Sequence, residues 1–155
     1  YSWQFLLDIL DKTIKNKTLK TMDIEIAILD RSWSYFQMFE TWKNRLILTD
    51  NEIDLFKQRH SELINQGKIN ISVFHYNHLP SRHGMLIDDK VLFLSICDFL
   101  SDNSGNFELT VGRNQYELFD RNEGLNSVHK ISQFNRLFNF YKATSLEQRE
   151  VPLKE

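Results

Sequence analysis

The chain has 155 residues, of which 41% are hydrophobic and 26% are charged. A chain of this length can bury a core of its own without disulfides or metal ions, so we expect a single domain. The formal net charge of -2 supplies no overall positive field for nucleic acid or anionic lipid. No apolar run approaches the roughly 20 residues that span a bilayer. These properties exclude a membrane-spanning protein and a strongly basic nucleic-acid binder.

The only cysteine, Cys97, lies in the apolar run VLFLSIC. A single thiol cannot form an internal disulfide, and we expect it to be a small buried side chain in a cytoplasmic protein. The chain opens at Tyr1 rather than at a methionine. We therefore expect a longer protein with an additional domain.

Apolar residues at helical spacing predict an amphipathic helix over residues 2–17. Residues 23–29 alternate apolar and polar side chains, as in a half-buried strand. Asp30, Arg31 and Ser32 follow at its carboxyl end, where open α/β sheets bind ligands. These three residues are either neighbours of a site or a cap for the next helix. Residues 33–47 are compatible with a helix or a loop.

A second helix is indicated by a capping box, formed by Thr49 and Glu52, and by Gly67 as a left-handed stop. His60 falls on its apolar stripe, so we expect this histidine to be packed rather than to bind a ligand. Residues 68–76 alternate again and predict a second strand.

The rest of the chain predicts a hairpin, a further strand and a last helix. The hairpin strands, the further strand and the helix are expected over residues 84–87, 91–97, 107–111 and 128–141. Asn126 or Ser127 is the expected cap of the last helix, and Ser145 begins a polar tail. The order of elements predicts the α/β class, with a mixed β-sheet flanked by helices.

One stretch, PSRHGMLIDDKVLFLSICDF, places His83 beside the hairpin, whose second strand leads through Ser95 to Asp98. This order resembles the histidine-centred motif of the phospholipase D superfamily, H-x-K-x4-D followed by a strand and G-S-x-N. The resemblance implies one phospholipase D-like half over residues 1–144 and a tail over residues 145–155. It also implies His83 as the nucleophile, Ser95 as the motif serine, and Glu108 as the carboxylate of a later strand.

The motif departs from the family at the positions that carry charge. Met85 stands at the lysine place, and Leu94 replaces the glycine before the serine. If Arg82 is aligned with the lysine of the motif, Pro80 is aligned with the nucleophile. If His83 is aligned with the lysine, Ser81 is aligned with the nucleophile. Such a phosphodiesterase needs a nucleophilic imidazole, a second imidazole and lysines, from two motifs per site. With one incomplete motif, we expect a noncatalytic module.

The expected site gathers Arg82, His83, Ser95, Asp98 and Glu108 around an anionic or phosphate-containing group, with no metal and no cofactor. Arg82 and His83 would contact the anion, Ser95 would hydrogen-bond it, and Asp98 or Glu108 would orient the histidine. The module would serve ligand sensing or association in a larger regulatory or nucleic-acid-processing protein, as a homodimer in one arrangement. The alternative is a homodimeric phosphodiesterase or nuclease with His83 as its nucleophile.

Three rival interpretations use overlapping residues. Histidines and carboxylates close in sequence offer a zinc or manganese site; they are His75, His78, His83, Asp88 and Asp89. A serine hydrolase would use Ser81 or Ser95, although the chain has no G-x-S-x-G motif. A nucleic-acid surface would combine basic and aromatic residues, namely Arg82, Arg113, Arg121, Lys130 and Arg136 with Tyr116, Phe119, Phe134 and Phe140.

Overall fold

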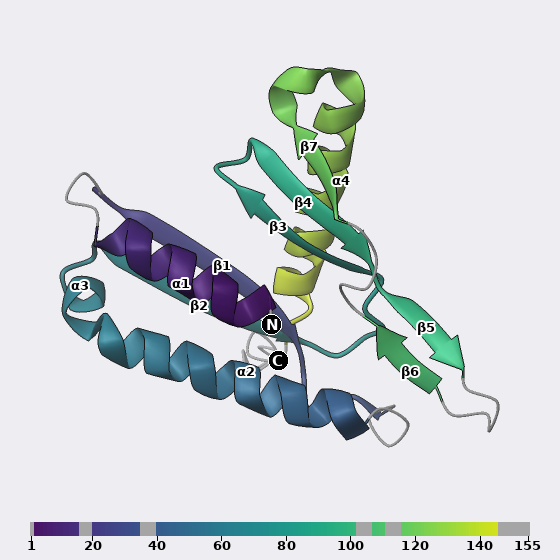
Figure 1. Cartoon of the computed structure of the whole chain (residues 1–155), viewed down its shortest axis with the longest axis horizontal. Coiled ribbons are helices and arrows are strands. Elements are labelled where there is room, and N and C mark those ends of the chain that lie inside the picture. Colours follow the sequence, from purple (N-terminus) through teal and green to yellow (C-terminus); the bar gives the residue numbers. More distant parts are fainter. Residues whose placement is uncertain (1, 16–19, 35–39, 102–106, 111–115, 146–155) are drawn as a thin grey trace, which may run out of the picture.

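The computed structural model of the chain confirms a mixed α/β fold (Figure 1). It describes residues 2–15, 20–34, 40–101, 107–110 and 116–145. The helices are α1 (Ser2–Ile14), α2 (Glu40–Arg59), α3 (Ser61–Asn65), η2 (Arg121–Glu123) and α4 (Leu125–Ala143). The strands are β1 (Met22–Leu29), β2 (Ile69–Tyr76), β3 (Arg82–Ile87), β4 (Val91–Ile96), β5 (Asp98–Ser101), β6 (Phe107–Thr110) and β7 (Glu117–Asp120).

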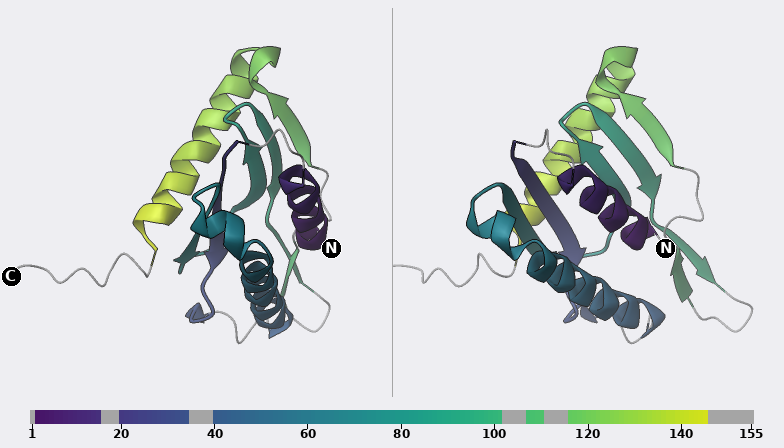
Figure 2. Two further views of the ribbon diagram at one scale, coloured as in Figure 1. Left: turned by 90° about the vertical axis from the view of Figure 1, so that its left-hand side faces the viewer. Right: turned by 60° about the vertical axis from the view of Figure 1, so that its left-hand side comes forward.

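Strands β1 and β2 form a parallel pair, with Met22 opposite Ile69 and Leu29 opposite Tyr76. Their predicted alternation is confirmed, because one face of the pair packs on α1 and α2 and the other on α4 (Figures 1 and 2). Phe74 meets Phe138 of α4 edge-on, with ring centroids 6.4 Å apart. The pair is thus held between two helical layers.

Strands β3, β4 and β7 form an antiparallel sheet in that order. The predicted turn between β3 and β4 is confirmed: Asp88 and Asp89 both have positive φ, and the Lys90 amide donates to the Ile87 carbonyl at 2.9 Å. Positive φ at both central residues gives a turn whose twist matches that of the strands. This turn sets which β3 and β4 residues face each other.

Helix α4 covers one face of this antiparallel sheet. Leu92 and Leu94 of β4 and Phe119 of β7 are buried there against Ile131, which is fully buried. A second apolar cluster includes Ile28, Trp33, Leu46, Cys97 and Tyr141. The prediction of a buried thiol at Cys97 is confirmed. Helix α4 contributes to both clusters.

Two short strands extend beyond the main hairpin. Strands β5 and β6 pair antiparallel, with Leu100 opposite Glu108. The expected strand at residues 107–111 is therefore confirmed as β6, whereas β5 and β7 were not predicted. The expected loop at residues 102–106 lies outside the described residues. Ser145, the expected first residue of the polar tail, is instead buried, and residues 146–155 of that tail lie outside the described residues.

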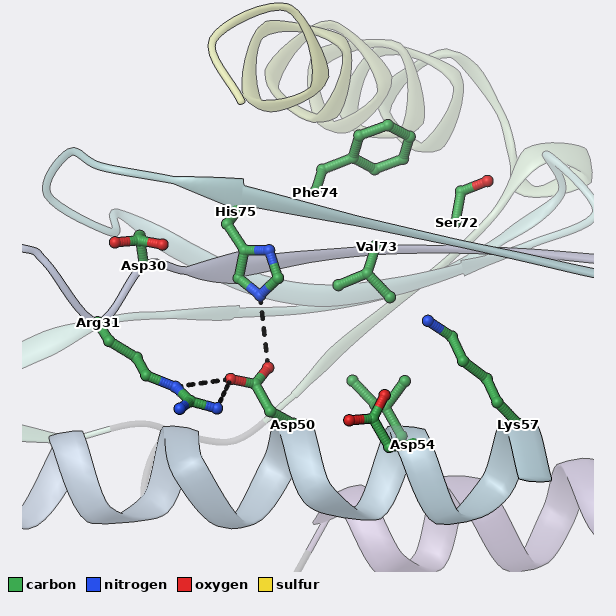
Figure 3. A pocket seen from close by; sticks show the side chains of 10 residues that line it. Asp30, Arg31, Asp50, Asp54, Lys57, Ser72, Val73, Phe74 and His75 are labelled. Carbon is green, nitrogen blue, oxygen red and sulfur yellow. Dashed lines mark hydrogen bonds and ion pairs between the residues drawn. The ribbon is translucent and has the colours of Figure 1, made fainter. Parts of the chain in front are cut away.

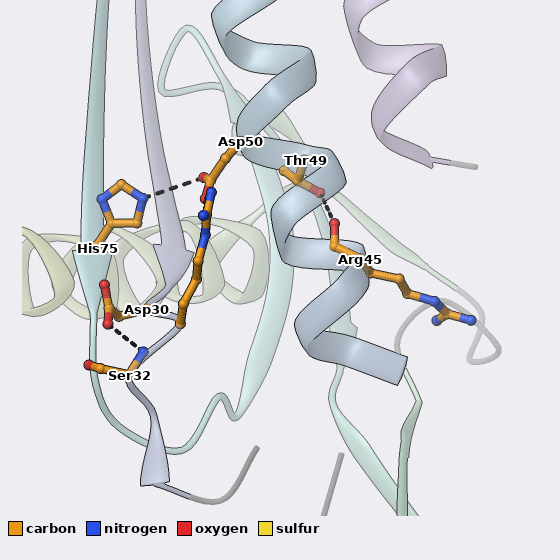
Figure 4. Close-up of polar contacts among 7 residues, drawn as sticks. Asp30, Ser32, Arg45, Thr49, Asp50 and His75 are labelled. Carbon is orange, nitrogen blue, oxygen red and sulfur yellow. Dashed lines mark hydrogen bonds and ion pairs between the residues drawn. The ribbon is translucent and has the colours of Figure 1, made fainter. Parts of the chain in front are cut away.

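The predicted start of the second helix is wrong. Thr49 lies inside α2, and its hydroxyl donates to the Arg45 carbonyl four residues earlier at 3.0 Å (Figure 4). A threonine can satisfy its hydroxyl in this way within a helix, so the capping pattern alone did not mark a terminus. The predicted stop is confirmed: Gly67 has a φ of 68° and donates its amide to Ile64. The helical segment is divided at His60, between α2 and α3.

The predicted cap of the last helix is also wrong. Asn126 and Ser127 lie within α4, whose N-cap is Gly124, a residue with a φ of 111° and no side chain to donate or accept. Ser127 is buried.

Among the described residues, no helix is long and apolar enough to cross a bilayer.

Candidate functional site

The hairpin places two predicted site residues directly opposite each other. His83 of β3 pairs with Ser95 of β4. Because neighbouring side chains on a strand point to opposite faces, both lie on the sheet face away from α4. Ser95 is only 3% exposed, and its Oγ has no hydrogen-bond partner among the described residues. An unpaired buried hydroxyl is costly, which makes this position a candidate for a bound polar group.

Tyr116 completes this cluster from a distant part of the chain. Its hydroxyl lies 2.7 Å from Nδ1 of His83, and the two rings meet edge-on at 5.7 Å between centroids. Burial lowers the pKa of His83, so the neutral imidazole predominates at pH 7. If the phenol donates to Nδ1, the imidazole proton lies on Nε2 and can be donated to a ligand.

Arg82 and Met85 are placed by the pleat of β3. Arg82 pairs with Ile96 and lies on the face opposite to His83, so it does not join His83 and Ser95. Met85 lies on the same face as His83 and pairs with Phe93. Met85, the residue that the expected resemblance matches to a lysine, therefore lies beside His83 and carries an uncharged thioether.

The two predicted carboxylates lie on the short strand pair. Asp98 of β5 pairs with Thr110, and Glu108 of β6 pairs with Leu100. Both backbones are thus in extended strands, as the sequence pattern indicated for Glu108. Their side chains lie outside the described residues, and their expected role in orienting His83 stays a prediction.

A second polar site lies between β2 and α2, as an open groove of about 700 Å³. Figure 3 shows His75 and Val73 pointing from β2 toward α2, and Asp50, Asp54 and Lys57 pointing back from the helix. Asp50 is the central residue: its Oδ2 accepts from Nε of Arg31 at 2.9 Å and from a terminal guanidinium nitrogen at 2.5 Å.

The same carboxylate reaches the imidazole of β2. Oδ1 of Asp50 lies 3.4 Å from Nε2 of His75 (Figure 4). Asp30 instead closes the turn after β1, because its Oδ1 accepts from the Ser32 amide at 2.7 Å. Arg31 lines the groove, while Asp30 both lines the groove and holds the turn; whether this segment neighbours a ligand site stays a prediction. Asp50 and Lys57 were not predicted.

His60 and His78 pack against neighbouring side chains. His60 Nε2 lies 2.5 Å from Oδ1 of Asp11 on α1, and its ring lies 4.7 Å from Phe56. The prediction of a packed His60 is confirmed. His78 lies against stacked Tyr76 and Tyr141 rings, 4.8 Å and 4.9 Å from their centroids, and burial lowers its pKa.

The metal and nucleic-acid interpretations find little support. No group of three or more histidine, cysteine or acidic side chains converges to hold a metal ion in the part of the chain that the structure describes. Phe119 is buried and Phe134 of α4 packs against the same apolar cluster, so these two rings are not available to stack on bases. Tyr116 and Phe140 are exposed, and Arg113 lies outside the described residues.

No protein family, curated protein or solved structure matches this chain. The His83 cluster and the groove are therefore the features of this chain that point to a function.

Proposed function

We propose that the chain is a noncatalytic, phospholipase D-like binding module that holds a phosphate-containing or other anionic group beside His83. The observation that carries this proposal is the cross-strand pair of His83 and Ser95, with a buried Ser95 hydroxyl that has no hydrogen-bond partner among the described residues. As an association or ligand-sensing module of a larger protein, it would report the presence of this group rather than cleave it.

The chemistry of the cluster suits binding by hydrogen bonds. With Tyr116 at Nδ1, the His83 Nε2 proton and the Ser95 hydroxyl are two neutral donors on one face. Two neutral donors can hold phosphate oxygens, and each hydrogen bond to such a charged group contributes about 1.5–3 kcal/mol in net terms. We therefore expect a weak and selective site.

The same chemistry argues against turnover. Phosphoryl transfer needs fixed positive charge on the oxygens that gain negative charge, and removal of one such donor costs about 3–4 kcal/mol. Met85 occupies the position two residues from His83 on the same face, and Arg82 lies on the other face. The described cluster thus has an imidazole but no adjacent cation.

Titration calorimetry tests the proposal with inorganic phosphate, a nucleoside monophosphate and an inositol phosphate as probes. At least one should bind, and His83→Ala should weaken that binding about 10- to 150-fold, the contribution of one hydrogen bond to a charged group. The matched control is His129→Ala, since His129 is an exposed histidine on α4 and should leave binding unchanged. No binding of any probe, or equal binding by His83→Ala, would overturn the proposal.

A second assay separates binding from catalysis. Hydrolysis of bis-p-nitrophenyl phosphate should not exceed the buffer rate. Turnover that disappears in His83→Ala would instead establish the phosphodiesterase alternative with His83 as nucleophile.

A further inference from the structure

The outer edge of β2 has backbone groups that are free to pair. The Met22 amide donates to Lys68 and the Asp30 amide to Tyr76, so the even-numbered residues of β2 direct their amides and carbonyls toward β1. In a parallel pair the alternate residues direct theirs to the other edge. Ile71 and Val73 are two of these, and their backbone groups have no partner among the described residues.

This edge lacks the features that usually prevent strand addition. Exposed edges are commonly protected by charged residues, proline or a bulge. Residues 69–76 contain no Lys, Arg, Asp, Glu or Pro, and their register with β1 is continuous. Strand β1, by contrast, includes Asp23 and Glu25, and Glu25 pairs with Lys142 of α4 at 2.5 Å. The β2 edge is therefore a template for a further strand.

The groove described above runs along this edge, beneath Val73 (Figure 3). Ile53 and Val73 provide apolar lining, and Asp54 and Lys57 point into the groove from α2. Asp50 is already paired with Arg31. Asp54 and Lys57 have no ion-pair partner among the described residues, so the groove presents one available negative and one available positive side chain about a helical turn apart.

We propose that β2 binds an extended peptide segment of a partner protein by strand addition. The peptide backbone would pair with Ile71 and Val73, and its side chains would enter the groove. Side chains two residues apart on a strand lie on one face, about 7 Å from each other, comparable with the roughly 5–6 Å between neighbours on a helix turn. An acidic and a basic side chain at these two positions would therefore meet Lys57 and Asp54. This site uses none of the His83 cluster.

Calorimetry with two capped threonine–valine heptapeptides tests the charge pattern. One carries glutamate and lysine two positions apart, and the other carries them in the exchanged order. One order should bind about tenfold more tightly, as expected for two exposed ion pairs replaced by two repulsions. In the double variant Asp54→Lys/Lys57→Asp the preference should reverse. Failure of both peptides to bind, or a preference unchanged in the double variant, would refute the proposal.

A backbone variant tests the strand pairing. Val73→Pro removes an amide that points away from β1, so the parallel pair should persist while both peptides lose binding. Circular dichroism and thermal melting check that the variant is folded; should it unfold, the charge-exchange variant still decides. The proposal would be overturned if a folded Val73→Pro protein bound the peptides as tightly as the wild type does. It would also be overturned if light scattering showed that the wild type is a dimer and that Val73→Pro dissociates it, because a second copy of the chain would then occupy the β2 edge. His83→Ala should bind the peptides normally, which separates this site from the anion site.

Discussion

Gly84 lies where β3 has no room for a side chain, so replacing it with alanine should destabilise the fold. A Cβ atom built there would lie 2.7 Å from the Phe93 carbonyl oxygen and 2.8 Å from Cε2 of Phe134. Both distances are well below ordinary contact of about 3.5–4.0 Å. The Phe134 ring can rotate, but the carbonyl belongs to the strand that pairs with β3. We expect Gly84→Ala to lower the free energy of unfolding by about 1–3 kcal/mol, the usual cost of overpacking.

Urea unfolding measures this loss, and thermal melting should show a decrease of about 2–12 °C, from roughly 2–4 °C per kcal/mol for a domain of this size. Phe134→Leu, made alone and with Gly84→Ala, separates the two contacts. The leucine should cost less stability in the alanine background than in wild type, with a coupling of at least about 0.5 kcal/mol. A Gly84→Ala protein within about 0.5 kcal/mol of wild type, or a coupling near zero, would refute this reasoning.

The structure makes four other predictions. Ile131→Ala removes a side chain that is fully buried beneath the antiparallel sheet and should cost about 2–5 kcal/mol in urea unfolding; a loss below about 1 kcal/mol would contradict the packing. Thr49→Ala should change the free energy of unfolding by no more than about 0.5 kcal/mol, because Thr49 lies inside α2. A decrease of about 1 kcal/mol or more, which is typical of a lost helix cap, would show that a helix begins at Thr49. Burial raises the pKa of the Cys97 thiol to about 11, so an aromatic disulfide reagent should label it rapidly only in urea; equal labelling of the native protein would disprove its burial. Burial lowers the pKa of His83, so its neutral form stabilises the fold above the unfolded pKa of about 6.5, and this contribution is lost as the pH falls toward the folded pKa. The free energy of unfolding of the wild type, relative to that of His83→Gln, should therefore decrease from pH 7 to pH 5. A difference that stays constant over this range would be inconsistent with burial of His83.

Local patterns predicted the long strands β1 and β2 and the turn between β3 and β4, but not the short strands β5 and β7. The alternation in β1 and β2 and the polar turn at Asp88 and Asp89 depend on neighbours along the chain, and each is confirmed. The starts of α2 and α4 were not predicted, although α1 begins at Ser2 as expected. Thr49 and Ser127 are residue types that favour caps, but in this fold one bonds back within its helix and the other is buried. Tertiary packing decided both positions.

The candidate site likewise includes contacts that local sequence patterns predicted and contacts that they did not. The pairing of His83 with Ser95 follows from the hairpin register, and the sequence brought both residues into one predicted site. Tyr116 reaches His83 across 33 residues, next to a strand of four residues that was too short to recognise. Asp50 likewise joins Arg31 and His75 across 19 and 25 residues. Contacts of this kind depend on the packing of elements, and no local period indicates them.

The position of α4 has a consequence for how the chain folds. This helix supplies Ile131 to the cluster under the antiparallel sheet and Tyr141 to the cluster beside the parallel pair. It is also the last regular element described along the chain. At a synthesis rate of about 5–20 residues per second, both sheets would leave the ribosome with an uncovered apolar face for at least a second before α4 follows. Folding of the two sheets is therefore completed together, by the same late helix, and a chain interrupted before Leu125 should be prone to aggregate.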